Sequence, residues 1–262
     1  MSILLFYIKK IYPSALTFIE QAKTAMSANT NNSESVANHF NAHWDRYLQV
    51  VKNNALFHKE MFSTLDTFLQ KNINKPFTLA DMGCGDCSMI LPILMNKPIQ
   101  RYIAMDATVS LIEKARANTI ELDCEKEFIC EDMRTGINKL TKPIDIIFSS
   151  YAVHHLSYDN KVHFLQQCQN KLENNGYFIL VDGVLAINQK RDAWIIELGK
   201  RLRAAHPEMT DEEADELLDH PRKDDFPESI ATFETIAQRQ KWKNVEVLVD
   251  KDIFAFMVFS KG

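Results

Sequence analysis

The sequence predicts an α/β protein built on a doubly wound, mostly parallel sheet. Short and almost continuously apolar segments alternate with segments of helical periodicity between residues 77 and 182. Strands of this kind are buried on both faces, which is typical of a parallel sheet covered by helices. Right-handed crossovers then favour a doubly wound order of strands. Two final apolar segments are joined by a tight turn, so one reversed strand is expected at the end of the sheet.

The first 35 residues are expected to be a leader helix and a polar linker. Residues 1–25 are apolar, but two lysines and a proline interrupt them before they reach a membrane-spanning length. The lysines follow the apolar run, which is not the order of a signal peptide. Residues 27–35 are polar and rich in turn formers, as in a linker. Contact of residues 1–25 with a membrane surface is the alternative interpretation.

The body of the protein, residues 36–262, is predicted to be a single domain. Helical spacing of apolar residues predicts two capping helices within residues 36–75. The five expected parallel strands are residues 77–82, 102–106, 128–132, 144–150 and 177–182. The helices expected between them are residues 89–95, 109–118, 133–140 and 159–172.

Residues 185–225 interrupt the alternation with a polar, helical insertion, which we interpret as a lid. Thr210 and Glu213 have the spacing of a capping box, which predicts that a helix begins there. The acidic run after Thr210 is interpreted as a solvated helix face without a chemical role. The two strands of the closing hairpin are expected at residues 245–251 and 252–260.

Composition and charge disfavour several classes of protein. The chain of 262 residues is 46% hydrophobic and 25% charged, which is ordinary for a globular protein. Its net charge of −5 disfavours a nucleic-acid binder, so no nucleic-acid partner is expected. Five irregularly spaced cysteines favour a reducing, cytoplasmic setting over a secreted disulfide framework. The oligomeric state is left open.

The segment LADMGCGDCSMI joins the first predicted strand to the helix after it. Gly83 and Gly85 have no side chains, so a ligand can approach the backbone closely. Ser88 is placed to cap the next helix. Cys84 and Cys87 form a C-x-x-C pair, for which a redox or metal centre is one interpretation. No second pair supplies further zinc ligands, so no metal site is expected, and the cysteines are interpreted as small residues that fill the turn.

Acidic residues end three successive predicted strands: Asp81, Asp106, and the pair Glu131 and Asp132. Asp106 is placed where a carboxylate accepts hydrogen bonds from the two hydroxyls of a ribose. Asp132 suits the amino group of an adenine, with Met133 against the ring face. A nicotinamide-dependent dehydrogenase is the alternative, but position 88 is serine and so many carboxylates disfavour a pyrophosphate.

Five segments together resemble the successive motifs of the class I S-adenosylmethionine-dependent methyltransferases. They are LADMGCGD, IAMDATVSLIEKARAN, FICEDMR, DIIFSSYAVHHL and LENNGYFILVDGV, which cover roughly Phe77 to Val184. The resemblance implies a seven-stranded sheet that extends to Phe259 and whose last strand is antiparallel. It also implies an enzyme with S-adenosylmethionine as cofactor.

The resemblance further implies how the cofactor is held. Asp81, Gly83 and Gly85 would hold its methionine part, Asp106 its ribose, and Asp132 with Met133 its adenine. The other candidate cofactor-binding residues are Cys84, Ala107, Glu131, Ser149, Ser150 and Tyr47. An aromatic face favours a cation, so Tyr47 or Trp44 is a candidate to cover the sulfonium. The chain departs from the family pattern at Cys87, where many members have a third glycine.

The candidate catalytic residues follow the fourth and fifth predicted strands. His155 is the first choice for removing a proton from the acceptor, with His154, Tyr151 and Asp182 as further candidates. The predicted function is methyl transfer to a small-molecule acceptor. Methylation of a macromolecule such as tRNA or protein, and a cofactor-binding protein without catalysis, are the alternatives.

Overall fold

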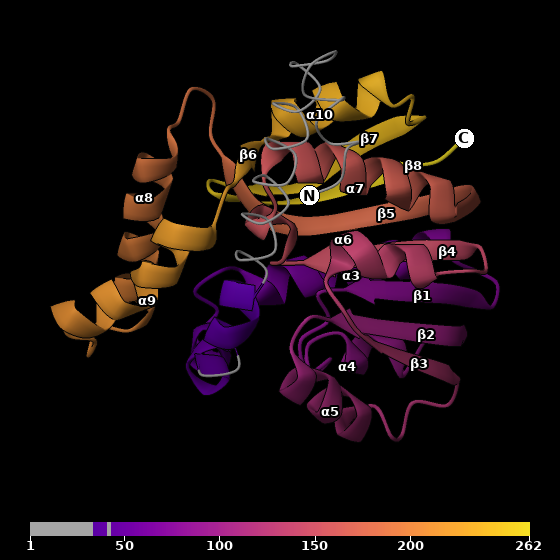
Figure 1. The fold of residues 1–262 in the computed structure, drawn as a ribbon, viewed down its shortest axis with the longest axis horizontal. Coiled ribbons are helices and arrows are strands. Elements are labelled where there is room, and N and C mark those ends of the chain that lie inside the picture. Colours follow the sequence, from indigo (N-terminus) through magenta and orange to yellow (C-terminus); the bar gives the residue numbers. More distant parts are fainter. Residues whose placement is uncertain (1–33, 41–42) are drawn as a thin grey trace, which may run out of the picture.

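The computed structural model describes residues 34–40 and 43–262, which form one sheet with helices on both faces (Figure 1). The strands are β1 (Phe77–Met82), β2 (Ile99–Asp106), β3 (Glu125–Cys130), β4 (Ile144–Ser150), β5 (Leu172–Leu185), β6 (Glu228–Ser229), β7 (Asn244–Lys251) and β8 (Phe254–Ser260). Seven of them lie in the order β3-β2-β1-β4-β5-β8-β7, and β6 pairs with the end of β5. Strands β1 to β5 are parallel to their neighbours among themselves. The predicted fold class is confirmed.

The closing hairpin differs from the prediction in where it places the reversed strand. β8 is antiparallel to both β5 and β7, so the last strand is the reversed one, as expected. It is inserted between β5 and β7 and therefore lies inside the sheet, while β7 forms the edge. The two strands differ in burial, which accounts for their order: β8 is buried almost throughout, whereas every residue of β7 is half-buried or exposed. The more apolar strand takes the inner position because it is covered on both faces there.

The helices between the parallel strands follow the predicted pattern: α5 has the predicted bounds, and the ends of the others are shifted. They are α3 (His58–Asn72), α4 (Leu91–Leu94), α5 (Val109–Asn118), α6 (Met133–Gly136), η1 (Ile137–Lys139), η2 (Val153–His155), α7 (Tyr158–Lys171), α8 (Arg191–Ala205), α9 (Asp211–Asp224) and α10 (Ile230–Arg239). Before α3, residues 34–40 and 43–52 are helical, so the described part of residues 36–75 contains three helical segments where two were predicted. The capping box that begins α9 is confirmed: Thr210 accepts from the backbone N–H of Glu213, and Glu213 accepts from that of Thr210.

The helix after β1 is shorter than expected. The sequence predicted a helix over residues 89–95 capped by Ser88, but α4 begins only at Leu91. The carboxylate of Asp86 accepts hydrogen bonds from both the backbone N–H and the hydroxyl of Ser88, at 3.0 and 2.6 Å. Ser88 is therefore engaged in a turn and does not cap a helix, because such local side-chain bonds compete with helix formation.

The sheet divides the hydrophobic core into two clusters, and β8 shows the division. Phe254, Phe256 and Val258 pack in the cluster that also holds buried residues of α3, α4, α5 and α8. The alternating residues Met257 and Phe259 pack in the other cluster, with α7 and α10. Successive side chains of a strand point to opposite faces, so a strand with both sets apolar must be covered on both sides.

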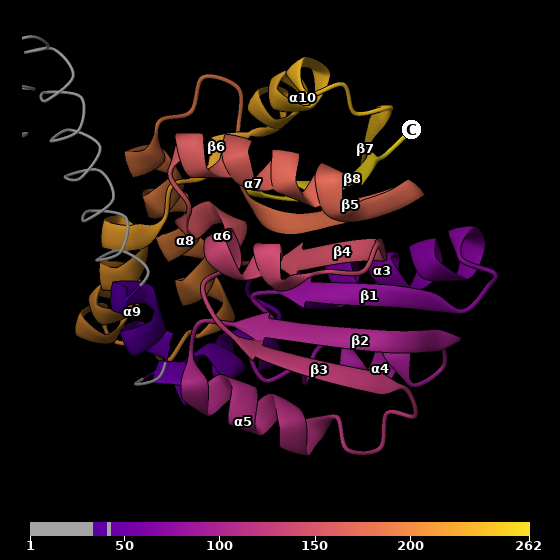
Figure 2. The ribbon, with the colours of Figure 1, turned by 45° about the vertical axis from the view of Figure 1, so that its right-hand side comes forward.

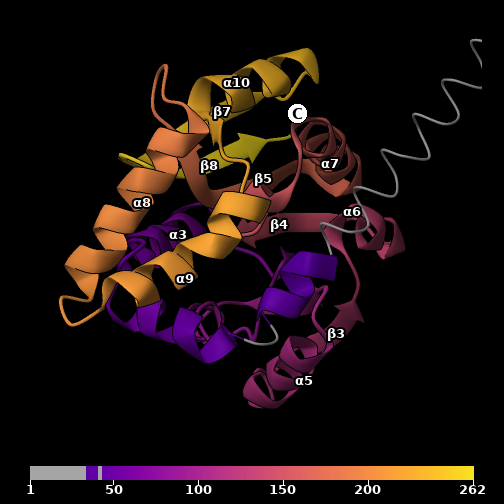
Figure 3. The ribbon, with the colours of Figure 1, turned by 60° about the vertical axis from the view of Figure 1, so that its left-hand side comes forward.

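The helical residues 34–40 and 43–52 lie with α8 and α9 at one end of the sheet, where β1, β2 and β4 end (Figures 1 and 2). Figure 3 shows α9 beside these helical residues. Several side-chain contacts join them: Arg46 pairs with Glu216 at 2.9 Å, and Ser35 donates to Asp224 at 3.1 Å. The rings of His39 and Phe40 also pack against His220. Segments that are far apart in the sequence thus meet over the carboxyl ends of the parallel strands.

The predictions for residues 1–33, which include most of the leader and linker, lie outside the described residues. Among the helices of the described part of the chain, none is both long enough and apolar enough to cross a membrane.

Candidate active site

A cavity of about 1150 Å³, open to solvent, lies at the carboxyl ends of the central strands. Most of the site residues chosen from the sequence line it, although they come from five separate segments of the chain. They are Tyr47, Asp81, Gly83, Cys84, Gly85, Asp106, Ala107, Glu131, Asp132, Met133, Ser150, Tyr151 and His155. Ligand sites of open α/β sheets are expected at this end, where adjacent strands diverge.

Three of the chosen residues do not line the cavity. Ser149 is fully buried, and its hydroxyl donates to the backbone carbonyl of Met82 at 2.7 Å, contrary to the expected cofactor contact. Alternate residues of a strand face opposite sides, so Ser150 lines the cavity and Ser149 does not. Asp182 is buried behind His154, so neither of them has the expected position facing an acceptor.

The two oxygens of the Asp81 carboxylate differ in their hydrogen bonds to the described residues. The side chain is 2% exposed, and its Oδ2 accepts a hydrogen bond from the Tyr102 hydroxyl at 2.8 Å. Its Oδ1 has no hydrogen-bond partner among the described residues. Burial raises the pKa of Asp81 to about 7, although the Tyr102 hydrogen bond opposes that shift. A buried oxygen without a partner is costly, so this atom is suited to a cationic N–H donor of a ligand.

The glycine turn after Asp81 has no room for side chains. Gly83 has φ +78°, and a Cβ built on it would lie 2.5 Å from the Cβ of Ala152. Gly85 has φ +54°, and its Cβ would lie 2.5 Å from the Trp44 ring. Cys87 also has a positive φ, 62°, which explains why glycine suits this position in the family that the sequence resembles.

The C-x-x-C pair is part of the packing around this turn. Cys87 is buried, and its Sγ lies 3.1 Å from the Tyr102 hydroxyl, whose single hydrogen is donated to Asp81. Burial, reinforced by Cys87, raises the pKa of the Cys84 thiol well above its ordinary value. A reactive or metal-binding cysteine needs a thiolate, so this environment favours the interpretation of both residues as small fillers of the turn.

Asp106 ties the end of β2 to the glycine turn. Its Oδ2 accepts from the backbone N–H of Gly85 at 3.0 Å, and its Oδ1 accepts from that of Thr108 at 2.8 Å. Burial raises the pKa of Asp106, while these two hydrogen bonds act in the opposite direction. Each oxygen of a carboxylate has a second lone pair, so both oxygens can still accept from neighbouring hydroxyls.

The acids after β3 are already paired within the protein. Asp132 caps α6, and Arg134 donates to both of its carboxylate oxygens, at 2.9 and 2.7 Å. Glu131 forms an ion pair with Lys139. These two ion pairs could not be predicted, because a lone arginine or lysine near an acidic residue has no diagnostic spacing. An amino group at Asp132 would have to share that carboxylate with Arg134.

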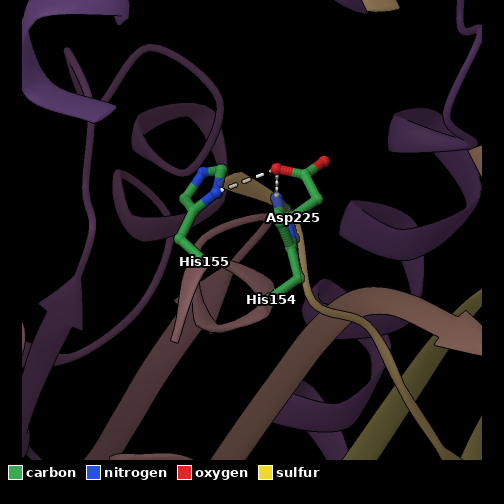
Figure 4. Close-up of side chains that lie close together, drawn as sticks. All are labelled: His154, His155 and Asp225. Atoms are coloured by element: carbon green, nitrogen blue, oxygen red, sulfur yellow. Dashed lines mark ion pairs between the residues drawn. The ribbon is translucent and has the colours of Figure 1, made fainter. Parts of the chain in front are cut away.

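Two buried pairs of histidine and aspartate meet beside the cavity. His154 Nδ1 contacts Asp182 Oδ1, and His154 Nε2 lies 3.5 Å from Asp225 Oδ1. Burial lowers the pKa of His154, but the carboxylates of Asp182 and Asp225 outweigh this effect and raise it above the ordinary value. His155 Nδ1 lies 3.0 Å from the same Asp225 oxygen (Figure 4).

Asp225 is the site residue that the sequence analysis missed. It ends the insertion interpreted as a lid and was not chosen as a site residue, yet it is 4% exposed and lies against His154 and His155. Burial disfavours the charged form of Asp225, but the neighbouring His154 and His155 hold its pKa well below the usual range. His220, one turn before the end of α9, also lies beside it, at 3.8 Å. The only sequence signal was the grouping of histidine and two aspartates at the end of a helix.

Aromatic rings form the wall opposite the glycine turn. The Trp44 ring packs on Gly85, and its N–H donates to Asp86 at 3.0 Å. The Tyr47 hydroxyl lies 3.1 Å from His58 Nε2, and the His58 ring lies 4.3 Å from that of Tyr151. Burial lowers the pKa of His58 to about 3, so the ring is neutral at ordinary pH. The wall therefore carries no positive charge of its own beside the cavity.

The chain is similar to known proteins in sequence and in fold. Residues 79–176 match the family described as the methyltransferase domain. A curated relative, a carboxy-S-adenosyl-L-methionine synthase of a Nitratiruptor species, is 20% identical over 154 residues, 57% of this chain and 62% of the relative. The chain thus aligns with less than two thirds of that relative's length.

Two solved structures show the similarity of fold. The magnesium protoporphyrin IX methyltransferase of Synechocystis PCC 6803, with bound S-adenosylmethionine, is 11% identical with a TM-score of 0.61, over 88% of this chain and 97% of that one. The plantazolicin methyltransferase BpumL, with S-adenosylhomocysteine, is 15% identical with a TM-score of 0.63, over 94% and 99%. At these identities the likeness establishes the fold.

Proposed function

We propose that this protein transfers a methyl group from S-adenosylmethionine to a small-molecule acceptor. It has the class I methyltransferase fold, and its residues 79–176 match the methyltransferase-domain family. The observation that carries the proposal is that Asp81 lines the cavity beside the glycine turn and that its buried Oδ1 has no hydrogen-bond partner among the described residues. The amino group of the cofactor is a cationic donor of the kind that this oxygen requires.

The other residues around the cavity support the same ligand. Gly83 and Gly85 leave the backbone accessible to the methionine part, and Asp106 keeps lone pairs for the two ribose hydroxyls. Tyr47 and Trp44 present aromatic rings, which favour the sulfonium cation. We place the adenine near Met133, with Asp132 held by Arg134.

Orientation supplies most of the catalysis in such a reaction, because the methyl group of the cofactor is already activated. Holding donor and acceptor in line at near-attack distance contributes on the order of 7–11 kcal/mol. We propose that residues 36–75 and 185–225 act as a cap and lid that exclude water. Contacts of Trp44 with Gly85 and of Asp225 with His155 support this, because they bring both segments to the cavity region.

We place the acceptor beside His155 and Tyr151. Among the candidate catalytic residues, these two line the cavity. Asp225 lies at Nδ1 of His155, so it can orient the ring while the other nitrogen accepts a proton from the acceptor. His154 and Asp182 lie behind this pair and are positioning residues in the proposal.

A small-molecule acceptor fits the net charge of −5 better than a nucleic acid does. The two similar structures described above are of methyltransferases named for a porphyrin and for the natural product plantazolicin. All five cysteines are free, which supports a reducing compartment such as the cytoplasm.

Calorimetric titration tests the cofactor assignment. We expect S-adenosylmethionine and S-adenosylhomocysteine each to bind at one site per chain, and a nicotinamide dinucleotide to show no binding. Binding of the dinucleotide alone would contradict the proposal. Incubation with candidate acceptors, followed by measurement of S-adenosylhomocysteine formation, then separates an enzyme from a cofactor-binding protein without catalysis.

Cofactor affinity is expected to fall as the pH decreases through about 7. The pKa of Asp81 is raised to about 7, so acidification protonates the carboxylate that binds the amino group. Below pH 7 the loss of affinity should therefore approach about tenfold for each pH unit. The affinity should also decline above about pH 8, because the amino group of the cofactor loses its charge there. Titrations from pH 5.5 to 8.5 measure this. The Asp81→Asn variant should bind the cofactor weakly, and its affinity should not change between pH 6 and 7.5. If its affinity fell with pH as steeply as that of the unmodified protein, Asp81 would not be the group responsible for the pH dependence.

Replacement of His155 by glutamine is expected to reduce turnover with little effect on cofactor binding. Loss of a general base lowers the rate by about 10²–10⁴-fold. The rate is measured with the acceptor found by the incubations above, and cofactor affinity by titration. His163→Gln, an exposed histidine on α7, is the matched control and should have the rate of the unmodified protein. Equal turnover in both variants would remove His155 from the reaction.

A further inference from the structure

We propose that His154, His155, His220 and Asp225 form a binding site for one divalent transition-metal ion. Ligand atoms of His154, His155 and Asp225 all lie within 4.8 Å of one another. Figure 4 shows the two histidines from the end of β4 pointing towards the carboxylate of Asp225, which the lid brings from the other side. No metal site was expected from the sequence, because the C-x-x-C pair has no second pair to complete a zinc site, and Asp225 lies in a different segment from His154 and His155.

Two of the separations around Asp225 Oδ1, those to His155 and His154, are typical of ligands that share an ion, and the separation to His220 is slightly longer. His155 Nδ1 lies at 3.0 Å, His154 Nε2 at 3.5 Å and His220 Nε2 at 3.8 Å from this oxygen. Ligands held at about 2.0–2.2 Å from one ion lie roughly 3.0–3.5 Å apart in octahedral or tetrahedral geometry. Small movements of the rings would therefore complete a coordination shell.

Two of these buried atoms lack hydrogen bonds. Asp225 Oδ1 and His220 Nε2 have no hydrogen-bond partner among the described residues, although their side chains are only 4% and 7% exposed. Buried polar atoms normally have hydrogen-bond partners. Buried ligand atoms that lie close together without well-directed hydrogen bonds between them therefore point to a bound ion. His155 Nδ1 also lies 3.3 Å from the backbone carbonyl of Asp224, and this contact competes with binding of an ion at Nδ1.

The residues behind the set resemble the outer partners of known metal sites. Asp182 contacts Nδ1 of His154, which leaves Nε2 directed towards Asp225. Asp224 Oδ2 lies 3.3 Å from Nδ1 of His220 in the same way. Histidine ligands commonly donate their second N–H to a carboxylate, which fixes the orientation of the ring.

The charge balance also favours a cation. Asp182, Asp224 and Asp225 are each at least nine-tenths buried within this group. Lys161 is a nearby buried cation, but its ammonium donates to the backbone carbonyls of Leu156 and Phe226. Burying several carboxylates together is costly unless positive charge accompanies them, and a divalent ion bound by the histidines would supply that charge in place of protonated imidazoles.

The ligand types select the class of ion. Imidazole nitrogen with one carboxylate suits zinc, iron, cobalt or nickel, whereas magnesium and calcium prefer oxygen ligands. The site does not depend on the proposed methyl transfer. With an ion on Nδ1, His155 keeps its proton on Nε2, so the general-base role proposed above belongs to the metal-free protein.

The test is titration of the full chain with Co²⁺ and Zn²⁺ after treatment with a chelator. We expect one ion per chain by calorimetry, and visible absorption bands of bound Co²⁺. Asp225→Asn and His220→Gln should each weaken binding by at least about 100-fold, and Asp182→Asn by about 10–100-fold. Mg²⁺ should not compete.

His163→Gln is the matched control and should bind the ion as the unmodified protein does. Circular dichroism on every variant separates a lost site from a lost fold, and Asp182→Asn provides a second measurement if Asp225→Asn does not fold. Absence of stoichiometric Co²⁺ binding by the unmodified protein would overturn the proposal. Equal affinity in Asp225→Asn, His220→Gln and the control would overturn it as well. None of these readouts depends on methyltransferase activity.

Discussion

Asp106→Ala is expected to weaken S-adenosylmethionine binding by about 10²–10⁴-fold. Two hydrogen bonds between a carboxylate and the ribose hydroxyls, each worth about 1.5–3 kcal/mol, would be lost together. The change also removes the acceptor of the Gly85 and Thr108 backbone N–H groups, so the glycine turn loses one of its supports. Calorimetric titration measures the affinity.

Two variants make the result specific. Asp106→Asn retains one acceptor oxygen without the charge, so its loss of affinity should be intermediate. Asp123→Ala removes an exposed carboxylate and should leave the affinity unchanged. If Asp106→Ala binds the cofactor as tightly as Asp123→Ala does, the ribose lies elsewhere and the placement of the cofactor is wrong.

Gly83→Ala is expected to destabilise the protein and to abolish cofactor binding. The new Cβ would lie 2.5 Å from the Cβ of Ala152, where neither neighbour has a flexible end that can move away. The φ of +78° adds about 1–2 kcal/mol for a residue with a side chain. Together with an overpacking cost of about 1–3 kcal/mol, this lowers the melting temperature by roughly 5–20 °C.

A double substitution separates the two causes. Gly83→Ala combined with Ala152→Gly removes the steric clash but keeps the unfavourable φ, so it should recover part of the stability. Gly262→Ala is the control, because its Cβ would have no neighbour nearer than 3.8 Å. Thermal denaturation measured by circular dichroism gives the stability. A double variant no more stable than Gly83→Ala would show that the backbone conformation accounts for the whole effect.

The strands were predictable because their signal is local. β1 and β4 have the predicted bounds, since an apolar run between polar residues identifies a strand buried on both faces. β5 begins earlier than predicted, at Leu172, because polar residues such as Asn174 and Asn175 do not look like a strand. The pairing of β8 with β5 depended on competition between two strands for the inner position, which neither strand encodes alone.

The cofactor end of the cavity was also largely visible in the sequence. Asp81, Asp106 and Met133 follow parallel strands directly, and the topology alone brings such residues to one edge. What the pattern did not show was the direction of Ser149 against Ser150, or the pairing of Asp132 with Arg134. These depend on the pleat of the strand and on the local path of the loop.

By itself, then, the sequence determined the α/β architecture and the row of acids and glycines at the strand ends. Only the tertiary structure decided the surroundings of His154 and His155, since Asp182, His220 and Asp225 reach them from distant segments. The physical reason is that periodicity and turn residues act over a few neighbouring positions, whereas a buried cluster of charges forms only when packing excludes water from groups contributed by several elements.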